Sequence, residues 1–201
     1  GTQSGANNFL NFLKQELLPF VNAHFRTNEQ RFLLGASLGA NMSLYAFIHG
    51  QDLFSGYLAI SPAKDEALFS QIKTSIMEFD ISQEVKLYLT RGGLEQTLVF
   101  DDLAKSLVKE QHNNLNVVFE TVPETGHAGV NAQGYTRALQ FFFQKTIVEI
   151  DEQTLKCYEG KFKNEQGEVY RFFIENQQLY ATNPNGLISP LTGVSPAEFT
   201  I

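Results

Sequence analysis

The stretch Arg31-Phe-Leu-Leu-Gly-Ala-Ser-Leu-Gly-Ala40 decides how this chain folds. Its apolar run, residues 32–34, is typical of a buried strand in a parallel sheet. Residues 35–39 then fit the pattern Gly-x-Ser-x-Gly, and apolar residues recur at helical spacing over 41–49. In such a strand, tight turn and helix, the central serine (here Ser37) stands exposed as a nucleophile. The pattern requires small residues before and after the serine, because strand and helix nearly collide there. The alternative is a glycine-containing strand-to-helix turn in which the serine has no catalytic role.

Length and composition narrow the class of protein. The 201 residues suffice for one sizeable domain with a small module, and 43% hydrophobic and 18% charged residues are ordinary for a globular protein. A net charge of −7 without a Lys/Arg cluster argues against a nucleic-acid partner. The sequence contains no run of 18 apolar residues, so we expect no membrane-spanning helix. We therefore expect a soluble protein.

The start of the chain and its single cysteine add little. Residues 1–5 carry neither an initiator Met nor the charged and apolar regions of a signal peptide, so the compartment, cytoplasmic or periplasmic, stays open. Cys157 has no partner for an intramolecular disulfide, and no nearby residues suggest a metal site. We expect no metal and no organic cofactor.

The order of the predicted elements indicates an α/β fold. Strands are predicted over 32–34, 56–61, 85–90 and 115–122. Helices are predicted over 7–25, 41–49, 65–79, 97–111 and 132–147, with Pro19 kinking or dividing the first of them. Strands that alternate with helices of this length form a parallel, doubly wound sheet.

Three side chains with acyl-transfer chemistry follow strands of this sheet. Ser37, Glu95 and His127 each come just after a predicted strand, so the loops that carry them should meet at one edge. Their order along the chain, nucleophile, acid and histidine, is the order used by α/β-hydrolases. His127 would take the proton of Ser37, and a carboxylate would hold the imidazole tautomer. The alternative is that His127 is an exposed loop histidine between glycines that has no role in catalysis.

The identity of the acid is open on sequence alone. Glu95 is the first choice, whereas Asp101 and Asp102 are expected in the first turn of a helix, where a carboxylate favours the dipole. Glu124 is expected to be a loop residue, and a Ser-His dyad without an acid is a further alternative. Arg91 lies near the same edge and could meet an anionic substrate, although pairing with a surface carboxylate is the preferred interpretation.

Other short segments of the sequence, together with the serine turn, match the pattern of a known family. They are Ser4-Gly5-Ala6, Phe9-Leu10, Phe12-Leu13, Glu16-Leu17-Leu18-Pro19, Arg31, Ser61-Pro62, Leu87-Tyr88-Leu89, Gly92 to Glu95, and Gly126-His127. With them, residues 3 to about 147 resemble the later half of the Putative esterase family of α/β-hydrolases, which contains esterase D-like enzymes and ferric-siderophore (enterobactin-type) esterases. The family turn usually reads Gly-His-Ser-Leu-Gly-Gly, and Ala36 and Ala40 are small replacements here. The resemblance implies that Ser37 is the nucleophile and His127 the base, while members differ in the acid.

The resemblance also predicts what this chain lacks. The family has strands and helices before the helix that opens this sequence, so the chain looks like a fragment. An oxyanion hole needs two donors. The backbone amide of Leu38 is the expected first donor, and the second would come from a loop after an early strand. We therefore expect that donor to lie outside these 201 residues.

The last residues change character. Short strands are predicted at 158–162, 168–174 and 178–181, joined by turns at 164–167, 175–177 and 184–186 without intervening helices. We expect an α/β-hydrolase domain over residues 1–149 and a small β-strand module over 150–201, with a polar linker at 150–154. The default interpretation of the module is a structural appendage, although it could shield the site, bind a ligand or mediate dimers.

Two classes of function remain in play. The first is a serine esterase acting on a small ester or a siderophore-like lactone, with thioesterase or peptidase chemistry as variants. The second is a non-catalytic α/β-hydrolase-like binding or scaffold protein, given the missing early strands. The expected partner in the first case is a small-molecule ester, and the sequence leaves homo-oligomerisation open.

Overall fold

The computed structural model of the chain describes residues 3–50, 52–78, 81–110, 113–145 and 147–201. The chain separates into two compact units, divided between Phe143 and Gln144. The expected boundary after residue 149 falls inside the second unit. Each unit has its own sheet, and each is described by itself below.

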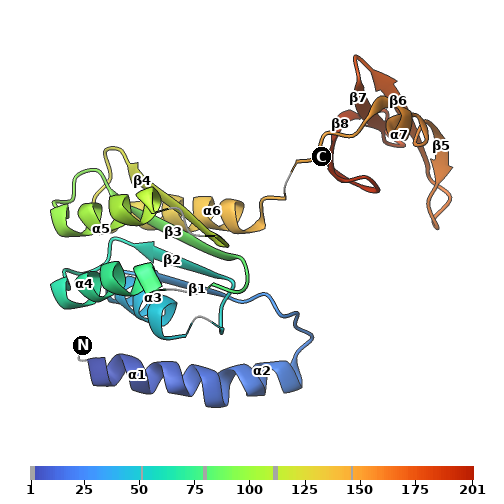
Figure 1. Cartoon of the computed structure of the whole chain (residues 1–201). Coiled ribbons are helices and arrows are strands. Elements are labelled where there is room, and N and C mark those ends of the chain that lie inside the picture. The colour runs from blue at the N-terminus through green and yellow to red at the C-terminus, as the bar shows by residue number, and fades with distance from the viewer. Residues whose placement is uncertain (1–2, 51, 79–80, 111–112, 146) are drawn as a thin grey trace. The chain divides into compact units, whose positions relative to one another are not determined.

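The first unit is built on a parallel sheet (Figure 1). Within the described residues its strands lie in the order β1-β2-β3-β4, the same as their order along the chain. Their bounds are β1 Phe32–Ala36, β2 Gly56–Ile60, β3 Val85–Gly92 and β4 Leu115–Val122. All three pairings are parallel, so every strand ends at the same edge. The predicted α/β class, with a parallel sheet whose strands alternate with helices, is confirmed.

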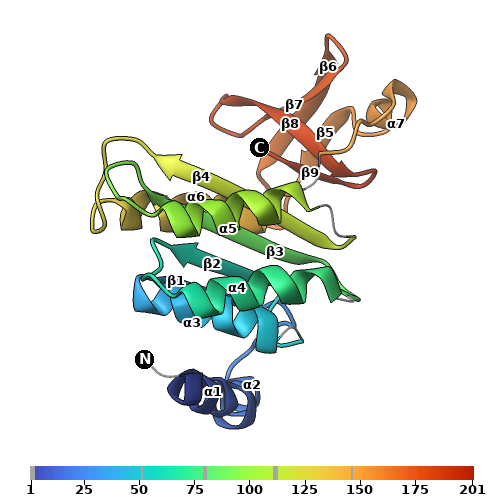
Figure 2. The same ribbon diagram turned by 60° about the vertical axis from the view of Figure 1, so that its left-hand side comes forward.

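Helices cover both faces of this sheet (Figure 2). The helices of the unit are α1 Gln3–Phe12, α2 Leu18–His24, α3 Leu38–His49, α4 Glu66–Ser75, α5 Leu98–Lys109 and α6 Val130–Phe143. Alternate residues of β2 face opposite ways, as the pleat requires. Tyr57 and Ala59 join the cluster beneath α3, α4 and α5, whereas Leu58 and Ile60 join the cluster beneath α6.

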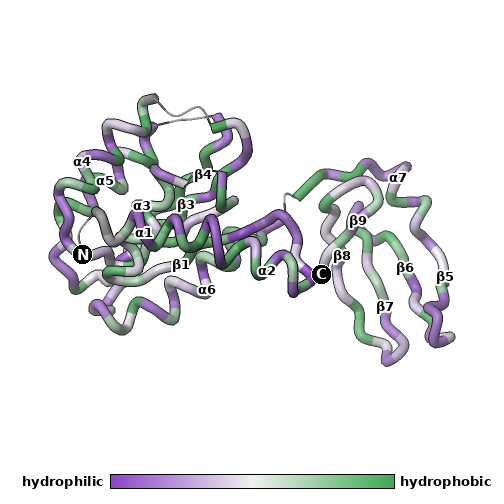
Figure 3. Tube along the Cα trace, turned by 90° about the horizontal axis from the view of Figure 1, so that it is seen from below, coloured by the Kyte–Doolittle hydropathy of each residue, from purple (hydrophilic) through white to green (hydrophobic). Residues whose placement is uncertain are grey.

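The first helix shows how one proline is accommodated. A π-helical segment, η1 Leu13–Leu17, joins α1 to α2, and Pro19 lies in the first turn of α2. A proline inside an α-helix removes one backbone donor and clashes with the carbonyl four residues earlier, and a π-turn is one way to absorb that conflict. Figure 3 shows hydrophilic and hydrophobic residues alternating along this helix. Leu10 and Leu13 on its apolar side belong to the main core.

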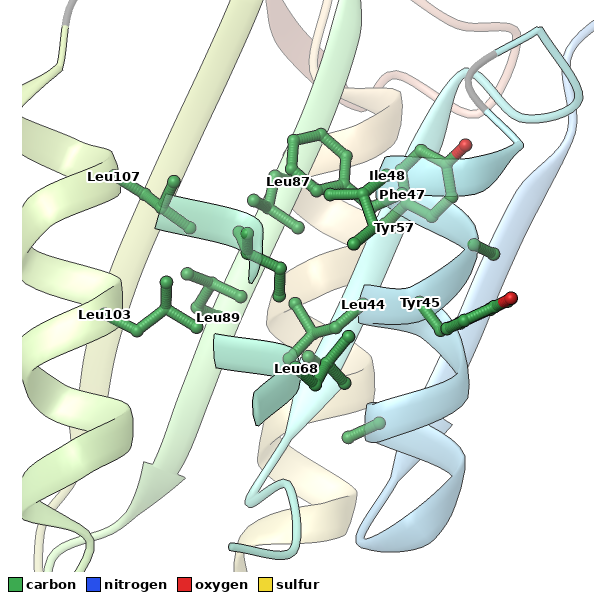
Figure 4. Packing of buried hydrophobic residues seen from close by; sticks show 14 of the residues in the cluster. Leu44, Tyr45, Phe47, Ile48, Tyr57, Leu68, Leu87, Leu89, Leu103 and Leu107 are labelled. Atoms are coloured by element: carbon green, nitrogen blue, oxygen red, sulfur yellow. The ribbon is translucent and has the colours of Figure 1, made fainter. Parts of the chain in front are cut away.

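The main core lies between the sheet and α3, α4 and α5 (Figure 4). Leu103 and Leu107 of α5 point toward Leu87 and Leu89 of β3, and all four side chains are at most 1% exposed. Burying such side chains stabilises a fold by roughly 1.5–3 kcal/mol each. This packing fixes the strands whose ends carry the candidate site.

The second unit is an antiparallel sheet. In the described residues its strands follow the order β5-β6-β7-β8-β9. Their bounds are β5 Gly160–Lys163, β6 Val169–Glu175, β7 Gln178–Thr182, β8 Ile188–Ser195 and β9 Glu198–Thr200. The predicted small antiparallel module is confirmed, but β8 and β9 were not expected. The stretch expected to be a linker overlaps the short helix α7 Glu152–Lys156, which Asp151 caps by accepting the Thr154 amide.

Candidate active site

The turn between β1 and α3 holds Ser37 in an unusual backbone conformation. Its φ is 56° and its ψ is −120°, a region that non-glycine residues rarely adopt. An ideal Cβ placed on Gly35 would lie 2.0 Å from the Gly39 carbonyl oxygen, so strand and helix do collide on that side. A Cβ on Gly39 would meet nothing within 4 Å. The expectation that both flanking positions must be small therefore holds for Gly35 and is wrong for Gly39.

Backbone hydrogen bonds fix this turn. The Ser37 amide donates to the Ile60 carbonyl of β2 at 2.9 Å, and the Asn41 amide donates to the Ser37 carbonyl at 3.2 Å. Among the described residues, the Ser37 side chain forms no hydrogen bond that caps α3. The helix α3 begins at Leu38, three residues before the predicted start at residue 41. Amides in the first turn of a helix have no partner within that helix, so the amide of Leu38 is not used by the backbone of α3.

The acid and the histidine of the predicted set are joined directly. His127 Nδ1 lies 2.7 Å from Glu95 Oε1. The Glu95 side chain is only 12% exposed, whereas the His127 side chain is 56% exposed. A carboxylate on Nδ1 favours the tautomer that carries its proton there, which leaves Nε2 free to accept one.

The second oxygen of Glu95 is also bound. Glu95 Oε2 accepts from the Ser61 hydroxyl at 2.5 Å and from the Gly92 amide at 2.7 Å. Burial alone would raise the pKa of Glu95, but the hydrogen bonds from Ser61, His127 and Gly92 outweigh it, and the pKa of this carboxyl lies below its ordinary value. The carboxylate is therefore stabilised in its ionised form.

The two loops that carry Glu95 and His127 are bonded to each other through their backbones. The Gly93 amide donates to the Val122 carbonyl at 2.8 Å, and the Leu94 amide donates to the Thr125 carbonyl at 3.0 Å. A Cβ on Gly92 would lie 2.3 Å from the Thr125 carbonyl oxygen, so only glycine fits this close approach. The acid and the histidine are thus set relative to each other by backbone contacts as well as by their own hydrogen bond.

The Arg91 guanidinium is engaged by a carboxylate and by backbone carbonyls. Its guanidinium donates to both carboxylate oxygens of Asp101, at 2.5 and 2.6 Å, and to the Gly92 carbonyl at 2.9 Å. The expected carboxylate partner is present, but the pair is not at the surface, because the two side chains are 15% and 11% exposed. The guanidinium also lies 3.4 Å from the Glu95 carbonyl oxygen, so this ion pair braces the loop that presents the acid.

The other carboxylates weighed as the acid lie elsewhere. Asp101 in the first turn of α5 is engaged by Arg91, and Asp102 pairs with Lys73. Glu124 is an exposed loop residue with a φ of 55°. Of the carboxylates considered from sequence, Glu95 is the one that the described structure places on His127.

The structure therefore joins Glu95 to His127, and Ser37 follows a strand that ends at the same edge of the sheet. Among the described residues, no hydrogen bond links the Ser37 hydroxyl to either side chain. Sequence reasoning missed Ser61, although Ser61 also directly follows a strand and precedes a proline. That position was the available signal, because polar residues after parallel strands gather at one edge.

The sequence shares a pattern with a known family of proteins. Over residues 1–128 it matches the family described as Putative esterase. The chain belongs to the Putative esterase family. No curated protein matches this family member in sequence.

Solved structures share the fold of this esterase-family chain. The BES protein from Bacillus cereus is 24% identical, with a TM-score of 0.62 over 68% of this chain and 54% of its own. An IroE-like serine hydrolase from Shewanella oneidensis is 24% identical, with a TM-score of 0.62 over 77% of this chain and 54% of its own. Siderophore hydrolase EstA from Aspergillus nidulans is 18% identical, with a TM-score of 0.58 over 69% and 56%. This chain thus spans about half the length of these proteins.

Across the described ranges, no group of three or more His, Cys, Asp and Glu side chains is arranged to hold a metal ion. Nor does any helix in those ranges have the length and apolar character needed to cross a membrane.

Proposed function

We propose that this member of the esterase family is a serine hydrolase that cleaves carboxylic esters of small molecules through an acyl-enzyme intermediate. The observation that carries the proposal is the 2.7 Å contact between His127 Nδ1 and Glu95 at the edge where the Ser37 turn also ends. Membership of the esterase family supports the same reaction class. The residues would act as nucleophile (Ser37), base (His127) and orienting acid (Glu95).

The first half-reaction forms the acyl-enzyme. Ser37 Oγ attacks the ester carbonyl carbon while His127 Nε2 takes the hydroxyl proton, and the imidazolium that forms is stabilised by Glu95. The tetrahedral intermediate then expels the alcohol, which leaves with the proton from Nε2. The half-buried, ionised Glu95 keeps the ring in the tautomer that this transfer needs.

The second half-reaction releases the acid. Water attacks the acyl carbon as His127 takes a proton from it, and Ser37 recovers its proton when the intermediate collapses. In both steps negative charge gathers on the former carbonyl oxygen. The amide of Leu38 is our candidate donor to that oxygen, because it lies directly after the nucleophile at the start of α3. The family pattern places the second donor on an early loop that these residues do not contain.

We further propose a siderophore-type ester or lactone as the substrate class. Its support is that several proteins sharing this fold carry that activity in their names, including Siderophore hydrolase EstA and the Enterobactin and Salmochelin Hydrolase IroE. A non-catalytic binding role is the second candidate, and it is favoured by the absence, among the described residues, of a hydrogen bond between Ser37 and His127.

The decisive experiment is hydrolysis of p-nitrophenyl acetate by the full-length protein and its Ser37→Ala variant, together with labelling by a fluorophosphonate probe. We expect labelling at Ser37 and loss of both labelling and turnover in the variant. A folded Ser37→Ala variant that keeps the parental rate would remove the assignment. A protein that is neither labelled nor active, yet folded, would support the binding role. Ser43, whose buried hydroxyl donates to the Leu33 carbonyl, provides a matched serine control.

A further inference from the structure

One residue connects the two halves of the candidate site. Ser61 directly follows β2, the strand that lies between the nucleophile strand β1 and the acid strand β3. Its neighbour Ile60 accepts the Ser37 amide at 2.9 Å, and its own hydroxyl donates to Glu95 Oε2 at 2.5 Å. Two consecutive residues thus hold the nucleophile turn on one side and the acid on the other.

From this geometry we propose that Ser61 is a positioning residue that sets the Glu95 carboxylate, and through it the His127 ring, in register with Ser37. The inference rests on the proposed esterase function. It assigns to Ser61 a role in catalysis that is exerted only through Glu95, without contact with the substrate.

The rotation of the carboxylate explains why this bond matters. Glu95 Oε1 meets His127, and Oε2 is held by two donors, the Ser61 hydroxyl and the Gly92 amide. Together with His127 on Oε1, the two donors on Oε2 hold the carboxylate plane in one orientation, and a carboxylate that turns would carry the imidazole with it. A misplacement of the base by a fraction of an ångström lowers the rate of proton transfer steeply.

The backbone at Ser61 fits this role. Its φ is 45°, a value that side-chain-bearing residues seldom adopt, and the residue is 2% exposed. Its amide donates to the Thr90 carbonyl of β3 at 2.8 Å, which holds the turn against the neighbouring strand. A non-glycine residue in such a conformation persists where the surroundings fix it, and such positions cluster at functional sites. Here the conformation delivers the hydroxyl to Glu95.

The test compares Ser61→Ala with Thr90→Val in the full-length protein. Ser61→Ala keeps a Cβ and the backbone preference, and it removes only the donor. Thr90 is 0% exposed, and in the described structure its hydroxyl has no hydrogen-bond partner, so Thr90→Val removes a neighbouring buried hydroxyl that Glu95 does not use. We expect kcat for p-nitrophenyl acetate to fall about tenfold to hundredfold in Ser61→Ala, with KM within about twofold, and neither to change in Thr90→Val.

A pH titration and a double-mutant cycle separate positioning from general loss of structure. Removing a donor to the carboxylate raises the pKa of Glu95, so an NMR titration of the Glu95 carboxyl should have its midpoint at higher pH in Ser61→Ala than in the parent; the ionisable groups near this carboxylate are His127 and Arg91. In a Glu95→Ala background, Ser61→Ala should cause no further loss, because its target is gone. An additive loss in that background would overturn the inference.

Failure of this inference and failure of the proposed function give different results. If the parent hydrolyses esters in a Ser37-dependent way but Ser61→Ala keeps the parental kcat and Glu95 titration midpoint, the positioning role is wrong and the function stands. If the parent is inactive, the catalytic role falls with the function. The NMR signal of the His127 Nδ1 proton gives a readout without turnover: it should shift and exchange faster in Ser61→Ala only, and an unchanged signal would reject positioning.

Discussion

The two sides of the candidate site are held in different ways. The nucleophile side, the turn at Ser37, is fixed by backbone hydrogen bonds and by the close contact of Gly35 with Gly39. The acid–base side has backbone bonds between its loops but depends on side chains as well, because Glu95 is bound by Ser61 and His127 and its loop is braced by Arg91. Damage to the first side should therefore harm folding, and damage to the second should harm chemistry first.

Glu95→Gln should give the largest effect and act on chemistry. The neutral amide no longer stabilises an imidazolium or selects the Nδ1–H tautomer, so kcat should fall by roughly 10²–10⁴-fold. Steady-state kinetics and thermal unfolding of the same sample check this. The matched control is Glu124→Gln, on an exposed loop. Equal losses in both variants would contradict the assignment of Glu95.

Gly35→Ala should disrupt the nucleophile turn at Ser37 and lower the stability of the fold. Its new Cβ would lie 2.0 Å from a backbone oxygen, so the strand and the helix must separate, at a cost of about 3 kcal/mol or more in the free energy of unfolding. Urea denaturation measures this. Gly39→Ala is the matched control, because its Cβ has open space, and it should be close to neutral. Equal stability of the two variants would show that the turn is looser than described.

Arg91→Met should have an intermediate effect on stability. It leaves the Asp101 carboxylate, whose side chain is 11% exposed, without its cation, which should cost about 2 kcal/mol, less than the full penalty for a buried pair. The loop of Glu95 loses its brace, so kcat should also fall. Asp102→Asn offers the contrast, since that side chain is 75% exposed and its pair should contribute less than about 1 kcal/mol. Chemical denaturation of both variants ranks the two pairs.

The smallest effect is expected from pH. Because the pKa of Glu95 is lowered in the folded state, its ionised form adds stability above the ordinary value of 4.5, and this is lost as pH falls through the lowered folded-state value. The difference in melting temperature between the parent and Glu95→Gln should therefore shrink below about pH 4.5. A difference that stays constant from pH 7 to pH 3 would mean that the hydrogen bonds do not favour the charged form.

Much of the fold followed from sequence because the signals were local. The apolar runs of the parallel strands and the pattern around Ser37 marked where the strands end, and the order of those ends pointed to Glu95 and His127. Two strands of the second unit, β8 and β9, escaped prediction, since Pro190 and Gly193 interrupt the alternation in β8 and β9 is short.

The parts of the site that could not be predicted depend on contacts across the sheet. Arg91 and Asp101 are ten residues apart, and nothing in their spacing shows that both turn inward as a bidentate pair. Ser61 and Glu95 follow different strands, and their bond exists only because β2 and β3 are neighbours in parallel register. Such pairings become visible only when the strand order is known.

The backbone angle at Ser37 has a consequence for protein stability. A conformation with φ of 56° suits glycine better than any residue with a side chain, so Ser37→Gly should make the fold more stable while removing the hydroxyl. Ser37→Ala keeps the Cβ and should gain little. Thermodynamics by itself would place glycine at this position, and under the proposed function the serine supplies the oxygen atom that the reaction needs.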